Sequence, residues 1–116
     1  MGMMTNAADE CLLVLTNLPD RAAAESLAGK VVGGSLAACA NILAPCRSVY
    51  RWKGTVHADE EHPLLIKTTR KRYPALEAAI RQSHPYELPE IIAIPVTGGL
   101  PAYLDWVVQE TRESGA

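Results

Sequence analysis

A stiff polar connector leads into an apolar run at residues 83–96, which read Ser-His-Pro-Tyr-Glu-Leu-Pro-Glu-Ile-Ile-Ala-Ile-Pro-Val. Pro85 and Pro89 fix their own φ and lack a backbone donor, so the connector is expected to be extended. The β-branched, apolar residues 91–94 predict a buried strand. Rigid loops beside buried strands often carry ligand-facing groups. Two interpretations of the connector therefore stay open: a capped turn that plugs the core, or a binding site.

The first part of the chain predicts a strand followed by a helix. Residues 11–16, Cys-Leu-Leu-Val-Leu-Thr, are an apolar run of strand length. Asp20 is a favourable N-cap, and apolar residues then recur at positions 24, 27, 28 and 31, which indicates a helix with one apolar stripe. The pair Gly33-Gly34 suits the C-terminal end of this helix.

A long hairpin is predicted next. Residues 36–40 are rich in alanine and could continue a helix, but residues 41–45 and 49–52 favour extended structure, so residues 35–53 are interpreted as one strand bent around Pro45. Gly54 marks the turn, and residues 55–59 and 64–68 are expected to return antiparallel. Pro63 cannot donate a hydrogen bond to a sheet ladder, so it is expected at a sheet edge or a bulge.

The remaining elements complete a known order. A second helix begins near Arg70, with Tyr73, Leu76 and Ile80 on one face, and a third begins near Pro101. The order β-α-β-β-α-β plus a C-terminal helix is typical of an α+β, ferredoxin-like sandwich, with helices on one face of a four-stranded antiparallel sheet. Residues 1–9 are expected to be a disordered tail and residues 10–116 a single domain.

Composition excludes several classes of function. The chain of 116 residues carries 11 basic and 13 acidic side chains, and this balance gives no electrostatic footprint for nucleic acid or an anionic membrane. No apolar run approaches the roughly 20 residues of a membrane span. The three cysteines follow no recognisable signal peptide, which favours free thiols in a reducing, cytoplasmic setting.

Several side chains could carry chemistry, each with an ordinary alternative. Alternation along a strand would place His57, Asp59 and Glu61 on one face, which suits a divalent ion or simply a solvated hairpin tip. Cys39 could be a small core residue, or a nucleophile if the fold brings His84 close as its base. The paired glycines lack the spacing of a nucleotide-binding loop.

An ordered set of motifs resembles the CutA family of divalent-cation tolerance proteins. These motifs follow one another in family order over nearly the whole chain after its first ten residues. They are Leu36-Ala-Ala-Cys-Ala-Asn-Ile42, Ser48-Val-Tyr-Arg-Trp-Lys-Gly54, Glu61 followed by Leu65-Ile-Lys-Thr68, His84-Pro-Tyr-Glu-Leu-Pro-Glu-Ile91 and Tyr103-Leu-Asp-Trp106.

The resemblance implies a heat-resistant homotrimer of ferredoxin-like subunits, whose long hairpin between the second and third strands joins neighbouring sheets. It implies a non-enzymatic role in tolerance of divalent cations, with copper or another divalent cation as ligand and no organic cofactor. The residues carried over to clefts between subunits are Tyr50, Trp52, Glu61, Lys67, His84, Tyr86, Glu87, Glu90 and Trp106.

The resemblance also implies metal ligands. Cys39 and His84 are the metal candidates, because thiolate and imidazole suit copper. Thr16 and Ser83 stand where a copper-linked bacterial member has a cysteine and a second histidine. The implied partners are further copies of the chain and divalent cations, with neither nucleic acid nor membrane.

Two other functions stay open. One is a small enzyme that uses Lys67, Glu61 and His84 as acid–base groups in a pocket between subunits. The other is a signalling or scaffold trimer whose partner recognises the outer surface.

Overall fold

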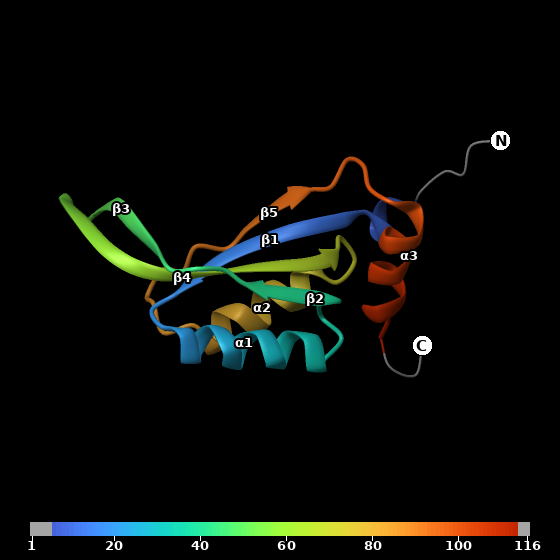
Figure 1. The fold of residues 1–116 in the computed structure, drawn as a ribbon, viewed down its shortest axis with the longest axis horizontal. Helices are drawn as coiled ribbons and strands as arrows, with labels where there is room; N and C mark the ends of the chain where they lie inside the picture. The colour runs from blue at the N-terminus through green and yellow to red at the C-terminus, as the bar shows by residue number, and fades with distance from the viewer. Residues whose placement is uncertain (1–5, 114–116) are drawn as a thin grey trace.

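The chain folds into one antiparallel sheet with three α-helices, as seen in a computed structural model that describes residues 6–113 (Figure 1). The strands are β1 (Cys11–Leu18), β2 (Cys39–Ile42), β3 (Cys46–Trp52), β4 (Thr55–Thr69) and β5 (Ile92–Pro95). The helices are α1 (Arg21–Gly33), α2 (Tyr73–Ser83) and α3 (Pro101–Glu110), preceded by the short 3₁₀-helix η1 (Ala7–Asp9). The predicted α+β class is confirmed, whereas its ferredoxin-like assignment stays a prediction.

The strand order in the sheet is β2-β4-β1-β5, and β3 pairs with the outer half of β4. This outer half and β3 form a hairpin that projects beyond the helices (Figure 1). The hairpin gives the molecule its length, with principal extents of 54 × 28 × 23 Å. The long predicted hairpin is therefore present.

The sequence predicts one bent strand over residues 35–53, and this prediction is wrong in detail. The structure has two strands there, β2 and β3, both paired with β4 and separated by the residues around Pro45. The two predicted returning segments are instead one continuous strand, β4, that includes Pro63.

Pro63 is tolerated inside β4 because no partner strand would accept a hydrogen bond from the backbone at this position. Its carbonyl accepts a hydrogen bond from the Leu43 backbone N–H at 3.0 Å, so its nitrogen faces the same side. On that side the ladder changes partner, from β2, which ends at Ile42, to β3, which begins at Cys46. The absent N–H therefore falls in the gap between two partner strands.

Helix α1 begins and ends as the sequence predicts. The Asp20 carboxylate accepts a hydrogen bond from the Ala23 backbone N–H at 2.8 Å, which caps the first turn. Gly34 is the C-cap residue, and its N–H bonds back to the Lys30 carbonyl at 3.0 Å. These two caps fix the length of the helix.

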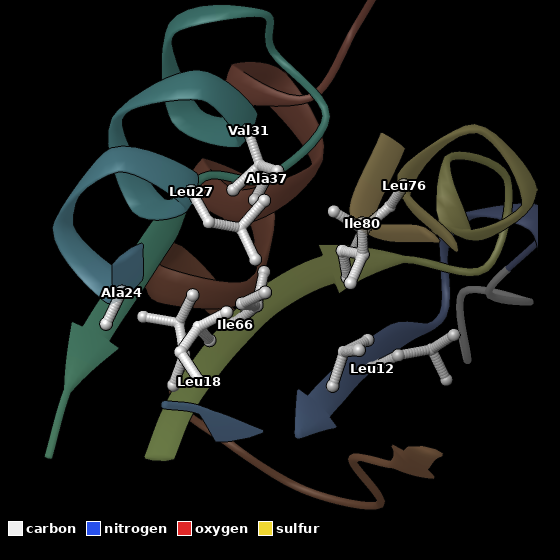
Figure 2. Packing of buried hydrophobic residues seen from close by; sticks show 11 residues of the cluster. Leu12, Leu18, Ala24, Leu27, Val31, Ala37, Ile66, Leu76 and Ile80 are labelled. Carbon is white, nitrogen blue, oxygen red and sulfur yellow. The ribbon is translucent and has the colours of Figure 1, made fainter. Parts of the chain in front are cut away.

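The core lies between the sheet and helices α1 and α2. Figure 2 shows side chains from both helices converging on those of β1 and β4. Burying each leucine, isoleucine or valine side chain here stabilises the fold by roughly 1.5–3 kcal/mol. The labelled members are Leu12, Leu18, Ala24, Leu27, Val31, Ala37, Ile66, Leu76 and Ile80.

The second face of the sheet is largely open. Odd-numbered β1 residues Leu13 and Leu15 point away from the core and are only half-buried. Helix α3 covers one end of this face, where the Cys11 thiol approaches the Leu104 carbonyl at 3.8 Å. In the described part of the chain, the middle of this face has no helix packed on it.

The prediction of a buried strand at residues 91–94 is therefore wrong. β5 pairs with β1 at the end of the strand order, and Ile92 and Ile94 are 48% and 49% exposed. Their side chains share the open face with Leu15 and Leu13, their register partners. An apolar run was correctly identified as a strand, but it lies at an uncovered edge.

The last residues of the predicted disordered tail, residues 7–9, are helical in the structure. Residues 7–9 form η1, whose N-cap Asn6 accepts a hydrogen bond from the Ala8 N–H at 2.9 Å. Residues 1–5 of that predicted tail lie outside the described residues. Among residues 6–113, no helix has the length and apolar character needed to cross a bilayer.

Candidate functional site

A cleft of about 680 Å³ lies between the β3–β4 hairpin and the loop that follows α2. This volume is in the range of small-molecule sites. Six of the residues implied by the family resemblance line it. They are Tyr50, Trp52, Glu61, Tyr86, Glu87 and Glu90.

Alternation along the hairpin builds one wall of the cleft. In the antiparallel register Tyr50 faces His57, and their rings stack with centroids 5.5 Å apart. The Tyr50 hydroxyl donates to the Asp59 carboxylate on the same face. The predicted alignment of His57, Asp59 and Glu61 on one face is consistent with this register, but His57 and Asp59 here contact a tyrosine.

His84 holds the loop that forms the other wall. It is buried, and its Nε2–H donates to the Asn17 carbonyl at 2.7 Å, while its Nδ1 accepts from the Tyr86 backbone N–H at 3.2 Å. An acceptor at Nδ1 fixes the neutral tautomer with the proton on Nε2. Burial lowers the pKa of His84, which keeps the ring neutral. His84 thus attaches the loop to the end of β1.

Two tyrosine–carboxylate pairs shape the cleft: Tyr86–Glu61 joins the loop after α2 to β4, and Tyr50–Asp59 joins β3 to β4 within the hairpin. Burial, and after it the hydrogen bond to the Glu61 carboxylate, raise the pKa of Tyr86 to about 12. The hydrogen bond to Asp59 raises the pKa of Tyr50. Both phenols therefore remain protonated hydrogen-bond donors at neutral pH.

The charge of the cleft is negative. Three carboxylates line it, from Glu61, Glu87 and Glu90, and among the described residues that line it there is no lysine or arginine. The Asn17 side-chain amide donates to Glu90 Oε1 at 3.3 Å, which orients that carboxylate. Such a lining favours a cation over a nucleotide or another anion.

Three other implied residues, Cys39, Lys67 and Trp106, form a separate group near α3. Cys39 and Lys67 are register partners on β2 and β4, and Lys67 Nζ lies 5.6 Å from the ring centroid of Tyr103. Tyr103 in turn contacts Trp106, with centroids 5.5 Å apart. Lys67 and Glu61 are separated by six residues of continuous strand, which is roughly 20 Å. One chain therefore keeps Lys67 apart from Glu61 and His84.

The two residues expected to bind metal also lie apart in one chain. Cys39 lies opposite Lys67 of β4, whereas His84 contacts Asn17, which lies opposite Pro63 of β4. The two residues are therefore positioned at different points along β4. Both His84 nitrogens already have protein partners. Within residues 6–113, no three histidine, cysteine, aspartate or glutamate side chains cluster closely enough to hold a metal ion.

Some cleft residues were not identified from the sequence. Asn17, Ser48, Val49 and Leu88 line the cleft, and Lys53 lies at its rim. The position of Asn17 at the end of β1 depends on the tertiary pairing of β1 with the loop after α2. Lys53 had a local signal, because it directly precedes the glycine of the hairpin turn.

Fold and site together define a small α+β protein with an acidic, aromatic cleft beside a projecting hairpin. The family model described as CutA1 divalent ion tolerance protein matches residues 12–110. The chain therefore belongs to the CutA1 family, as the ordered motifs indicated.

Individual relatives agree with this assignment. The divalent-cation tolerance protein CutA of Thermus thermophilus is 41% identical over 99 residues, which is 85% of this chain and 96% of the relative. Protein CutA 1, chloroplastic, of Oryza sativa is 41% identical over 103 residues, 89% of this chain but only 58% of the rice protein. The chain thus spans little more than half of this plant relative.

Solved structures show the same fold. The Thermus thermophilus protein superposes with a TM-score of 0.86 at 40% identity, covering 88% of this chain and 99% of that one. CutA1 from Oryza sativa gives a TM-score of 0.88 at 38% identity, covering 94% of this chain and all of the other. A third CutA, from Archaeoglobus fulgidus, has a TM-score of 0.85 and is described as periplasmic.

Proposed function

We propose that this protein is a non-enzymatic homotrimer that contributes to divalent-cation tolerance by binding cations in clefts between its subunits. The observation that carries the proposal is the cleft itself, with three carboxylates and two protonated phenols and, among its described lining residues, no basic side chain. The family's description as divalent ion tolerance proteins supports the same class of ligand.

The rim of the cleft supports its completion by a second copy. Val49 and Leu88 both line the cleft, and each is 70% exposed in the isolated chain. Apolar rims of this kind mark surfaces that are covered in an assembly. A neighbouring subunit placed there would bury both side chains and enclose the ligand.

The open sheet face supports assembly independently. Leu13, Leu15 and Leu65 are half-buried, and Ile92 and Ile94 are about half exposed, so a continuous aliphatic surface covers the centre of this face. Three sheets packed around a threefold axis would remove this surface and the β5 edge from water. The same burial would account for high resistance to heat.

Copper ligation by Cys39 and His84 is a narrower part of the proposal. Because these residues lie apart in one chain, a shared ion would need Cys39 from one copy and His84 from another. His84 would also exchange one of its two hydrogen bonds for the metal. Imidazole and thiolate are suitable ligands for copper.

The enzyme alternative would need Lys67 from a second copy of the chain, because within one chain Lys67 is roughly 20 Å along β4 from Glu61. We place the protein in the cytoplasm from its free cysteines. The rice relative is named as chloroplastic and the Archaeoglobus relative as periplasmic, so location varies within the family.

Light scattering and copper calorimetry together test the proposal. We expect the mass of three chains at micromolar concentration and saturable copper binding with an integral number of sites per trimer. A monomer would contradict the assembly, and the absence of copper binding would contradict the metal ligand.

Two variants test the copper ligands separately. Cys39→Ser and His84→Ala should each weaken copper binding at least tenfold if both residues ligate the ion. Unchanged affinity in either variant would remove that residue from the site. Circular dichroism of both variants checks that they remain folded.

A further inference from the structure

An ammonium group already occupies the rim of the cleft in this structure. Lys53 Nζ lies 5.5 Å from the ring centroid of Trp52 and 3.8 Å from Glu87 Oε2. An aromatic face and a carboxylate thus hold one cation between them, one on the hairpin and the other on the loop after α2. We call Trp52 and Glu87 the ammonium cradle.

The hairpin turn directs Lys53 into this cradle. Lys53 and Gly54 have φ values of 49° and 82°, as the two central residues of a type I′ turn require. This turn brings the lysine stem back over the preceding residue, Trp52. The contact thus joins two neighbouring residues at the tip of the hairpin.

The Lys53 contact is also weak enough to be displaced. The Lys53 and Glu87 side chains are 71% and 74% exposed, and ion pairs this exposed contribute little to stability. A cation–π contact at an exposed indole adds about 0.5–1 kcal/mol. A ligand ammonium that makes the same contacts, together with others deeper in the cleft, could replace Lys53.

The interior of the cleft continues the same chemistry. Beyond the cradle, the aromatic rings of Tyr50 and Tyr86 and the carboxylates of Glu61 and Glu90 line its walls. Aromatic faces attract organic ammonium groups, whereas small hydrated metal ions prefer several convergent oxygen ligands. The cleft is large enough for a flexible aliphatic ligand, at about 680 Å³.

We propose that the cleft binds an organic polyamine, one of whose ammonium groups displaces Lys53 from the cradle of Trp52 and Glu87. The inference rests on the proposed function of the cleft as a cation site and gives it a ligand class. The aliphatic stem of the ligand lies along the tyrosine rings, and its other ammonium groups approach Glu61 and Glu90.

Calorimetric titration of the full-length protein with spermidine tests this inference. Spermidine carries three ammonium groups at neutral pH, which matches the three lining carboxylates in number. We expect saturable binding with one site per chain, weakened by salt but still measurable at physiological ionic strength.

Variants of the cradle provide the specific readout. In the Lys53→Met background, where no internal ammonium competes for the cradle, Trp52→Leu should weaken spermidine binding roughly 2- to 5-fold, and Trp52→Tyr should restore most of this loss because it retains an aromatic face. Glu87→Gln should weaken binding in the same Lys53→Met background. If, in the Lys53→Met background, the Trp52→Leu variant binds as tightly as the variant that retains Trp52, the aromatic contact is refuted.

Removal of the internal ammonium gives the opposite result. Lys53→Met should tighten spermidine binding roughly 2- to 5-fold, because the ligand no longer displaces a cation from the cradle. Arg51→Met is the matched control, since Arg51 lies on the same hairpin but pairs with Val56 on the other face. An equal gain in both variants would show that only net charge matters and would overturn the inference.

A parallel copper titration separates this inference from the proposed function. Copper binding without spermidine binding overturns the polyamine ligand alone. Spermidine binding without copper binding overturns the metal part of the proposed function alone. Absence of both overturns the cleft as a cation site.

Discussion

Two buried threonines provide a sharp test of the core, because the same substitution is expected to have opposite effects at the two positions. Thr16 and Thr68 are both fully buried, on neighbouring strands β1 and β4. Thr68 Oγ1 donates to the Leu36 carbonyl at 2.7 Å. Thr16 Oγ1 has no hydrogen-bond partner among the described residues. Valine replaces each hydroxyl with a methyl group of similar shape.

The magnitudes follow from hydrogen bonding. An unsatisfied buried hydroxyl costs about 1–3 kcal/mol, so Thr16→Val should raise the free energy of unfolding by about 1 kcal/mol or more. Thr68→Val removes a hydrogen bond and leaves the Leu36 carbonyl without this donor. It should lower the free energy of unfolding by about 1–2 kcal/mol.

Urea unfolding at equal protein concentration measures both changes, with concentration fixed because assembly contributes to apparent stability. The expected result is a higher midpoint for Thr16→Val and a lower one for Thr68→Val, with unchanged slopes. A loss of stability in Thr16→Val comparable to that in Thr68→Val would refute the reasoning, because it would mean that the Thr16 hydroxyl is satisfied in the folded protein.

Three further predictions concern the loop, the cleft and the open face. Burial lowers the pKa of His84, so the unfolded chain binds a proton at this side chain more readily than the folded chain does. The free energy of unfolding should therefore be highest above the unfolded pKa of roughly 6.5 and fall as the pH drops through that value. Urea unfolding at several pH values measures this dependence, and His84→Gln should make it shallower. Glu61→Gln should lower the pKa of Tyr86 from about 12 toward its ordinary value near 10, but not fully, because the phenol remains buried. Ultraviolet titration measures this pKa, and comparison with Tyr86→Phe identifies the Tyr86 signal. An unchanged Tyr86 pKa in Glu61→Gln would contradict the prediction. Ile94→Asp should reduce the mass by light scattering to that of one chain, whereas Val32→Asp, at a similarly exposed position on α1, should leave it unchanged; equal masses for the two variants would argue against assembly through the open face.

Local signals in the sequence predict the elements whose causes are local. Asp20 caps α1 as expected because an N-cap depends on residues three positions apart. Lys53-Gly54 forms the hairpin turn because positive φ angles there need glycine at one central position. The family motifs likewise identified six residues that the fold gathers in one cleft.

Other features depend on tertiary partners and were not predictable locally. The apolar residues of β5 predict a strand, but not whether a helix, another chain or water covers its side chains. Residues 35–53 divide into β2 and β3 because β4 offers them two separate pairing segments. The capture of His84 by the Asn17 carbonyl joins residues 67 positions apart, which no local pattern indicates.

The expected site divides because of the geometry of a single strand. Lys67 and Glu61 belong to one strand, so a straight β4 keeps them roughly 20 Å apart whatever the rest of the chain does. Lys67 instead contacts Tyr103 of α3. A second copy of the chain would be needed to bring Lys67 to the cleft.

An anomalous difference map from crystals soaked in a copper salt tests the central claim most directly, because it locates both the subunits and the cation. We predict three chains around a threefold axis, with a copper peak in each cleft between the β3–β4 hairpin and the loop after α2. Chains without that arrangement, or copper peaks confined to sites outside the clefts, would contradict the account.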